Sequence, residues 1–157
     1  MVFASSTTDR IHKEVLLRAP RARVWQALAD MREFGAWFGI DLPDGSFRQG
    51  AQVAGQVTHP GYTHLTLRLS VEQVEPERLL SFRWHPDALE PNVDYDQEPT
   101  TLVAFELQGV PDGILLTIDE SGFDELPAHR RADAYRGNES GWAEQMVNIA
   151  RHIGDAA

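Results

Sequence analysis

The chain has 157 residues, the usual size of one domain, and contains no cysteine. The lack of cysteine excludes disulfide frameworks, thiolate nucleophiles and cysteine-based zinc sites. A formal net charge of −10 disfavours phosphate backbones and anionic lipid surfaces, so no nucleic-acid partner is expected. No window approaches the roughly 20 apolar residues of a membrane span, and residues 1–10 lack the features of a secretory signal. We therefore expect a cytoplasmic protein with a flexible tail over residues 1–10 and one domain over residues 11–157.

The first expected elements are a strand and two helices. Apolar and polar side chains alternate over residues 11–17, which predicts a short strand. Pro20 suits the first turn of a helix, and the apolar spacing from there to Met31 predicts about three helical turns. This pattern stops around Phe34, and a second, short helix is expected at residues 37–38.

A run of strands follows in the middle of the chain. Period-two alternation is weak around residues 53–57 and clear over residues 65–71 and 80–84, and two more strands are expected at residues 101–107 and 114–120. Turn residues at 75–77 and 111–113 separate them. Consecutive hairpins of this kind predict an antiparallel meander.

The last expected element is the longest helix. Residues 127–153 contain no internal proline and carry large apolar side chains on one face. The helices are therefore segregated from the strands in sequence, which indicates an α+β fold.

Several local patterns, in this order, resemble the START-like superfamily and, within it, the homologues of the activator of the heat-shock protein 90 ATPase. The resemblance covers most of the chain and rests on Ala19-Pro20, Val24-Trp25, Ala27-Leu28, Trp37-Phe38, Glu75-Pro76, Leu80, Phe82, Trp84, Leu116-Thr117, Glu120-Ser121-Gly122-Phe123, Gly141-Trp142 and Met146. It implies a helix-grip fold, in which a curved antiparallel sheet wraps around the C-terminal helix, with two short helices after the first strand. It also implies a cavity between sheet and helix that different members use for different apolar ligands.

Large apolar side chains on the strands and on the last helix are the candidate lining of this cavity. The set is Trp37, Phe38, Phe82, Trp84, Phe105, Phe123, Tyr135, Trp142 and Met146. Aromatic residues also dominate ordinary protein interiors, so a filled core is the alternative interpretation.

Two features of the last helix are not required for packing. Asn138 and Glu139 interrupt its apolar stripe, and Asn138 is a candidate ligand contact, unless both residues lie at the rim in water. Gly137 and Gly141 each cost about 1 kcal/mol relative to alanine inside a helix. Close approach of a ligand or strand would compensate for this cost, and a kink in the helix is the alternative.

Glu120 is the candidate polar group on the strands. The alternation places it on the same face as Leu116 and Ile118, whereas Glu106 falls with Leu102 and Ala104. A carboxyl group inside an apolar cavity is the least that acid–base catalysis would require. The alternative is a residue at a strand end in solvent.

No metal or cofactor is expected. None of the six histidines has the close spacing of a metal pair with a third ligand nearby, and the G-x-S-x-G signature of a serine nucleophile is absent. The segment between Trp84 and Thr101 is rich in Asp and Glu, contains neither Lys nor Arg, and is longer than most connections. It is expected to be a solvated loop, a lid or a contact for a partner.

Binding of a small hydrophobic or amphipathic molecule in the cavity is the preferred function. A cyclase-type or hydrolase-type enzyme that uses the same cavity is the first alternative. A chaperone-cofactor-like contact with another protein is the second, and it rests on the family resemblance alone.

Overall fold

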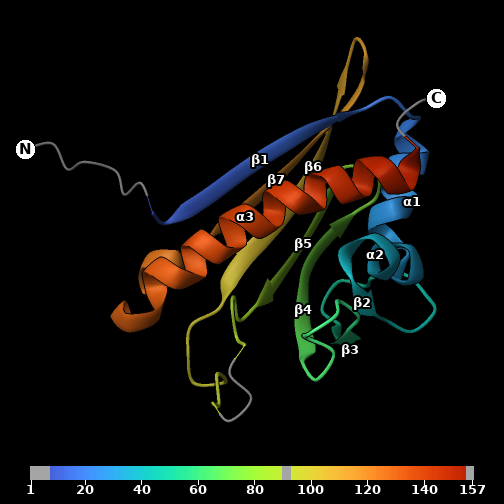
Figure 1. The fold of residues 1–157 in the computed structure, drawn as a ribbon. Coiled ribbons are helices and arrows are strands. Elements are labelled where there is room, and N and C mark those ends of the chain that lie inside the picture. The colour runs from blue at the N-terminus through green and yellow to red at the C-terminus, as the bar shows by residue number, and fades with distance from the viewer. Residues whose placement is uncertain (1–7, 90–92, 155–157) are drawn as a thin grey trace, which may run out of the picture.

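Seven antiparallel strands form one curved sheet, and the long helix α3 lies across it in the computed structural model of the protein (Figure 1). The structure describes residues 8–89 and 93–154. In chain order, the elements are β1 (Arg10–Leu17), α1 (Arg21–Ala29), α2 (Met31–Phe38), β2 (Ile40–Asp41), β3 (Gln52–Val57), β4 (Thr66–Glu75), β5 (Leu79–Trp84), β6 (Thr101–Val110), β7 (Gly113–Ser121), the 3₁₀ turn η1 (Phe123–Glu125) and α3 (Ala128–Ile153). This is the helix-grip α+β architecture predicted from the sequence.

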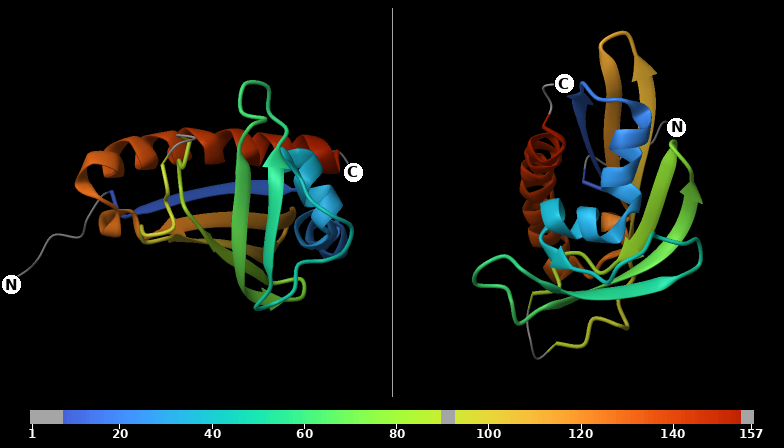
Figure 2. Two further views of the ribbon diagram at one scale, coloured as in Figure 1. Left: turned by 90° about the horizontal axis from the view of Figure 1, so that it is seen from below. Right: turned by 90° about the vertical axis from the view of Figure 1, so that its right-hand side faces the viewer.

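The strand order in the sheet is β1-β7-β6-β5-β4-β3-β2. Strands β2 to β7 follow one another as antiparallel neighbours, which confirms the predicted meander. The first strand joins this meander at its far end, where β1 pairs with β7 from Arg10↔Ser121 to Leu17↔Ile114. The pairing leaves β1 at one edge of the sheet and β2 at the other. The two views of Figure 2 show α3 on one side of the curved sheet, with α1 and α2 at the end of the sheet where α3 ends.

The break between the first two helices differs from the prediction. The apolar spacing suggested one helix through Met31 that stops near Phe34, but α1 ends at Ala29 and Phe34 lies inside α2. Asp30 separates the helices because its side chain accepts a hydrogen bond from the Glu33 backbone N–H at 3.0 Å and caps α2. Apolar periodicity continues across Asp30, so the periodicity does not show where α1 ends and α2 begins.

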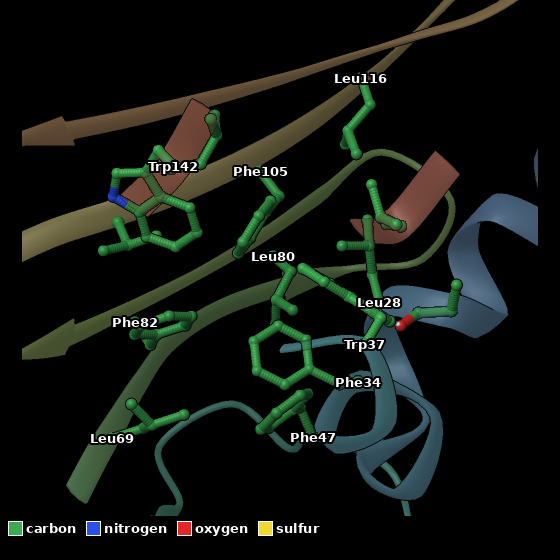
Figure 3. Close-up of a cluster of buried hydrophobic side chains, with 14 of the residues drawn as sticks. Leu28, Phe34, Trp37, Phe47, Leu69, Leu80, Phe82, Phe105, Leu116 and Trp142 are labelled. Carbon is green, nitrogen blue, oxygen red and sulfur yellow. Dashed lines mark hydrogen bonds between the residues drawn. The ribbon is translucent and has the colours of Figure 1, made fainter. Parts of the chain in front are cut away.

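The core lies between α3, the two short helices and the inner face of the sheet. Phe105 on β6 packs edge-on against Trp142 of α3, with ring centroids 5.7 Å apart (Figure 3). From the other side, Phe34 of α2 approaches Phe82 and Phe105 at 6.3 and 6.2 Å. Phe34, Phe82 and Phe105 have no exposed surface. Burying such side chains is the main favourable contribution to folding.

The first strand begins one residue earlier than predicted. Arg10 already belongs to β1, and the Asp9 carbonyl oxygen accepts the backbone N–H groups of Gly122 and Phe123 at 3.1 and 3.2 Å. Residues 1–7 of the predicted flexible tail lie outside the described part of the chain. None of the helices in the described ranges is long and apolar enough to cross a membrane.

Candidate functional site

Glu120 lies at the end of β7 with no exposed surface, and four side chains donate hydrogen bonds to it. Its Oε1 accepts from Trp142 Nε1 at 2.7 Å and from Asn138 Nδ2 at 2.8 Å. Its Oε2 accepts from Trp84 Nε1 at 2.7 Å and from Thr101 Oγ1 at 2.5 Å. The two carboxyl oxygens offer about four lone-pair sites, so these donors fill its accepting capacity.

The pleat of the sheet and the turn of α3 bring these donors together. Glu120 points inward because it alternates with Asp119 and Ser121, as the sequence predicted. Trp84 and Thr101 are directly paired across β5 and β6, so both reach the same oxygen. Asn138 and Trp142 are four residues apart on α3, and thus lie on one face of the helix. The prediction that Glu120 is inward is confirmed, and the alternative of a solvent-exposed strand end is wrong.

A small cavity of about 150 Å³ opens beside three of these donors. Its lining is Phe38, Trp84, Asn138, Gly141, Trp142 and Gln145. The rings of Phe38, Trp84 and Trp142 lie at nearly equal separations, with centroid distances of 5.9, 5.8 and 5.8 Å. Both indole N–H groups are committed to Glu120, so these two rings offer carbon surface to the cavity.

The cavity is the floor of a larger groove of about 800 Å³. One side of the groove is α3, from Gly137 to Asn148, and the other side is formed by the β3–β4 connection around residues 57–67 and the segment 84–89 after β5. The volume lies within the usual range for small-molecule pockets. Gly141 lies on the helical side, and a Cβ atom added there would meet no atom within 4 Å. The glycine therefore leaves space open that any larger residue would occupy.

The segment after β5 is held against α3 by Arg130. Its guanidinium group pairs with Glu98 at 2.8 Å and lies 4.7 Å from the centre of the Tyr95 ring. It also donates to the backbone carbonyl oxygens of Pro86 and Asp87, both at 3.0 Å. The predicted acidic loop is thus fastened at both of its described ends, and its first residues form one wall of the groove.

Asp87 is an unusual residue in that wall. Its φ of 53° lies in the left-handed region, which Asp tolerates better than most residues. Burial raises the pKa of the Asp87 carboxyl group, an effect that Arg130 opposes and Asp133 reinforces. Its Oδ1 lies 3.5 Å from the point where a Cβ on Gly137 would be, so Asp87 faces the glycine side of α3.

Comparison with known proteins places the chain in a family. Residues 18–154 match the model described as "Activator of Hsp90 ATPase homolog 1-like protein". The chain belongs to this family. The resemblance inferred from the sequence is therefore confirmed. A search of curated proteins found no match.

Solved structures share the fold of this chain. DynU16, a protein in the dynemicin biosynthetic locus, is 25% identical, with a TM-score of 0.70 over 92% of this chain, which spans 47% of DynU16. Protein MLL2253 from Mesorhizobium loti is 23% identical, with a TM-score of 0.72 over 94% of this chain and 98% of its own. The Aha1 dimer from Colwellia psychrerythraea is 14% identical, with a TM-score of 0.67 over 92% of this chain and 95% of its own.

Of the predicted site residues, five line the groove or its floor in this homologue, and Glu120 lies beneath them. The five are Trp37, Phe38, Trp84, Asn138 and Trp142. Phe82, Phe105 and Phe123 have no exposed surface and are part of the packed core. Tyr135 packs against Phe123 and donates its hydroxyl to the Arg10 carbonyl oxygen, and Met146 faces Lys13 and Val15 on the β1 side of α3. The structure therefore does not bring these last five residues to the groove.

Sequence reasoning missed Gln145, Glu144 and the wall residues after β5 as parts of the site. Gln145 donates to the Phe38 carbonyl oxygen at 2.8 Å and accepts from Asn148 Nδ2 at 3.1 Å. Its only signal was helical spacing, since Gln145 follows Asn138 and Gly141 at intervals of three and four residues. Gly137 and Gly141 cause no break, because α3 is continuous from Ala128 to Ile153. In the described ranges, no group of three or more side chains could hold a metal ion.

Proposed function

We propose that this member of the Hsp90 ATPase activator homologue family binds a small apolar or amphipathic molecule in the groove along α3. The observation that carries the proposal is the open aromatic floor, where three rings and Gly141 border a space of about 150 Å³ beneath a groove of about 800 Å³. Hydrophobic ligands are common among proteins of this fold family.

The Glu120 network supports this proposal by giving the floor a defined shape. Trp84, Asn138 and Trp142 all line the cavity and all donate to the same carboxyl group. Each indole is thereby held in one orientation, so the ring surfaces are arranged before a ligand arrives. A preorganised site loses less conformational freedom on binding than a mobile one.

The same network makes Glu120 a poor acid or base. A catalytic group must come within hydrogen-bond reach of the proton that it transfers. Glu120 has no exposed surface, and four protein donors already occupy its oxygens. We therefore assign Glu120 a positioning role and prefer ligand binding to the enzymatic alternative.

The test is to fill the cavity from Gly141. The variant Gly141→Leu adds an apolar side chain at a position where a Cβ atom meets no atom within 4 Å. We expect the affinity for the neutral fluorescent probe N-phenyl-1-naphthylamine to fall by about tenfold or more, because the variant side chain occupies the floor. Titration of the probe, followed by its fluorescence, measures this change.

The matched control is Ser140→Leu, which adds the same side chain to the next, exposed position of α3. It should leave probe affinity unchanged, since Ser140 does not line the groove. Gly141→Ala should raise the free energy of unfolding by about 0.5 to 1 kcal/mol through its helix propensity. Equal probe binding by the parent, Gly141→Leu and Ser140→Leu would refute the proposed site.

A further inference from the structure

The charged groups along the groove are of one sign. Asp87 and Glu144 line it, and among the described residues of the lining there is neither Lys nor Arg. Both carboxylates belong to walls that flank Gly141, since Asp87 faces Gly137 and Glu144 lies one turn further along α3. Arg130 binds the Asp87 carbonyl oxygen from outside the lining and offsets part of the Asp87 charge, so the lining itself contributes two carboxylates beside its apolar floor.

Several hydrogen-bond donors of the lining are already used within the protein, and each amide nitrogen keeps a second N–H. The indole N–H groups and the Asn138 amide nitrogen donate to Glu120, and the Gln145 amide nitrogen donates to the Phe38 carbonyl oxygen. His85 Nε2 lies 3.1 Å from the Glu98 carbonyl oxygen, which only accepts, so Nε2 carries the proton.

Several acceptors remain for a ligand. With its amide nitrogen turned to Glu120, Asn138 can offer its carbonyl oxygen, and a neutral His85 can offer Nδ1. The hydroxyl groups of Thr58 and Tyr62 can accept as well as donate. An ammonium group brings its own donors to these acceptors, whereas a carboxylate or phosphate ligand would lie beside the carboxylates of Asp87 and Glu144.

The aromatic floor favours a cation on separate grounds. The faces of Phe38, Trp84 and Trp142 carry the negative part of each ring's quadrupole, and a cation near such faces is stabilised, most strongly over tryptophan. The positive N–H edges of both indoles are turned to Glu120. Phe38 and Trp84 are partly exposed and Trp142 is buried, so the floor presents mainly the carbon surface of Phe38 and Trp84, which attracts ammonium groups and apolar chains alike.

We propose that the groove selects a protonated amine carried on an apolar body over neutral or anionic molecules of the same size. This inference rests on the proposed function and names the class of ligand for the same site. The apolar body packs on the three rings, and the ammonium group donates to Asp87 and to the acceptors around it. Burial raises the pKa of Asp87, and a bound cation would relieve this desolvation cost.

The experiment compares four ligands that share a ten-carbon chain: decylamine, decyltrimethylammonium, decanol and decanoate. Each displaces N-phenyl-1-naphthylamine from the full chain at pH 8, where alkylamines are protonated, below the micellar concentration. We expect decylamine to bind about tenfold more tightly than decanol and decanoate to bind more weakly than decanol. Decyltrimethylammonium should fall between decylamine and decanol, because it keeps the charge and lacks N–H donors.

Two variants then test whether the preference for decylamine depends on Asp87. Asp87→Asn suits the left-handed backbone and should lower the decylamine-to-decanol affinity ratio by about threefold to tenfold. Glu139→Gln removes the same charge from the outside of α3, where Glu139 pairs with Lys13 at 3.1 Å, and should leave the ratio unchanged. Added salt should weaken decylamine more than decanol.

The results distinguish failure of the amine inference from failure of the proposed binding site. If the parent binds the probe and Gly141→Leu weakens this binding, but decylamine displaces the probe no better than decanol, the amine inference is wrong and the binding site stands. If the parent does not bind the probe, both are wrong. A decylamine preference that Asp87→Asn and Glu139→Gln reduce equally would show general attraction to a negative protein and would overturn the inference.

Discussion

Glu120 shows how a single residue can determine the shape of a site without touching a ligand. A carboxyl group without exposed surface is expensive to bury, and it is tolerated only when its hydrogen bonds are complete. Strand alternation was enough to predict its inward position. Its partners were not predictable, because Trp84 and Trp142 lie 36 and 22 residues away, and only the pairing of the strands and the rotation of α3 bring them together.

Replacing Glu120 should therefore cost much more than replacing an exposed glutamate. Glu120→Gln presents an amide nitrogen where a carboxyl oxygen accepted, so at least one buried donor loses its partner. We expect the free energy of unfolding to fall by about 2 to 4 kcal/mol. Urea denaturation at unchanged slope measures this loss.

Glu106→Gln on the exposed face of β6 is the matched control, and its free energy of unfolding should stay within about 0.5 kcal/mol of the parent. Similar losses in both variants would show that the network is not specific.

At the level of elements, the ends of α1, α2 and α3 meet at Glu33. Its Oε1 accepts from Arg23 of α1 at 2.8 Å and lies 2.9 Å from Nε2 of His152 in the last turn of α3. Burial raises the pKa of Glu33, but the hydrogen bonds from His152 and Arg23 outweigh burial and leave the pKa below its ordinary value. The sequence predicted all three helices but not this junction, because nothing in the spacing of Arg23, Glu33 and His152 indicates that they meet.

The Glu33 junction should stabilise the fold in a pH-dependent way. Because the folded-state pKa is lowered, the contribution is present above the unfolded pKa of about 4.3 and is lost as the pH falls through the folded value. Glu33→Gln should therefore lower the free energy of unfolding by about 1 kcal/mol at pH 7, and the difference from the parent should shrink towards pH 3. Denaturant midpoints between pH 7 and pH 3 test this, with Glu106→Gln as the control. A constant difference across that range would exclude the ion pair as its cause.

For the whole molecule, the order of helices and strands was predictable because each element has a strong local pattern. The residues that form the groove were not predictable. Its walls come from the β3–β4 connection, the segment after β5 and α3, and none of these has a pattern that points to the others. Asp87 is an example: its place in the wall depends on Arg130, 43 residues later, which binds its carbonyl oxygen. Even the edge of the sheet follows from a distant pairing, because β1 joins β7 rather than its neighbour in the chain.

Because β1 pairs with β7, two N-terminal truncations can test how much the contacts of Asp9 and Arg10 stabilise the fold. The chain lacking residues 1–7 should be as stable as the parent, because this stretch has no apolar periodicity. Removing residues 1–10 should lower the free energy of unfolding by about 2 kcal/mol or more, since Asp9 accepts three backbone N–H groups from residues 122–124 and Arg10 pairs with Asp119 at 2.6 Å. Urea midpoints at equal slope distinguish the two truncations. An equal loss in both would mean that residues 1–7 contribute to the fold, and no loss in either would mean that the contacts of Asp9 and Arg10 do not hold β1 in the sheet.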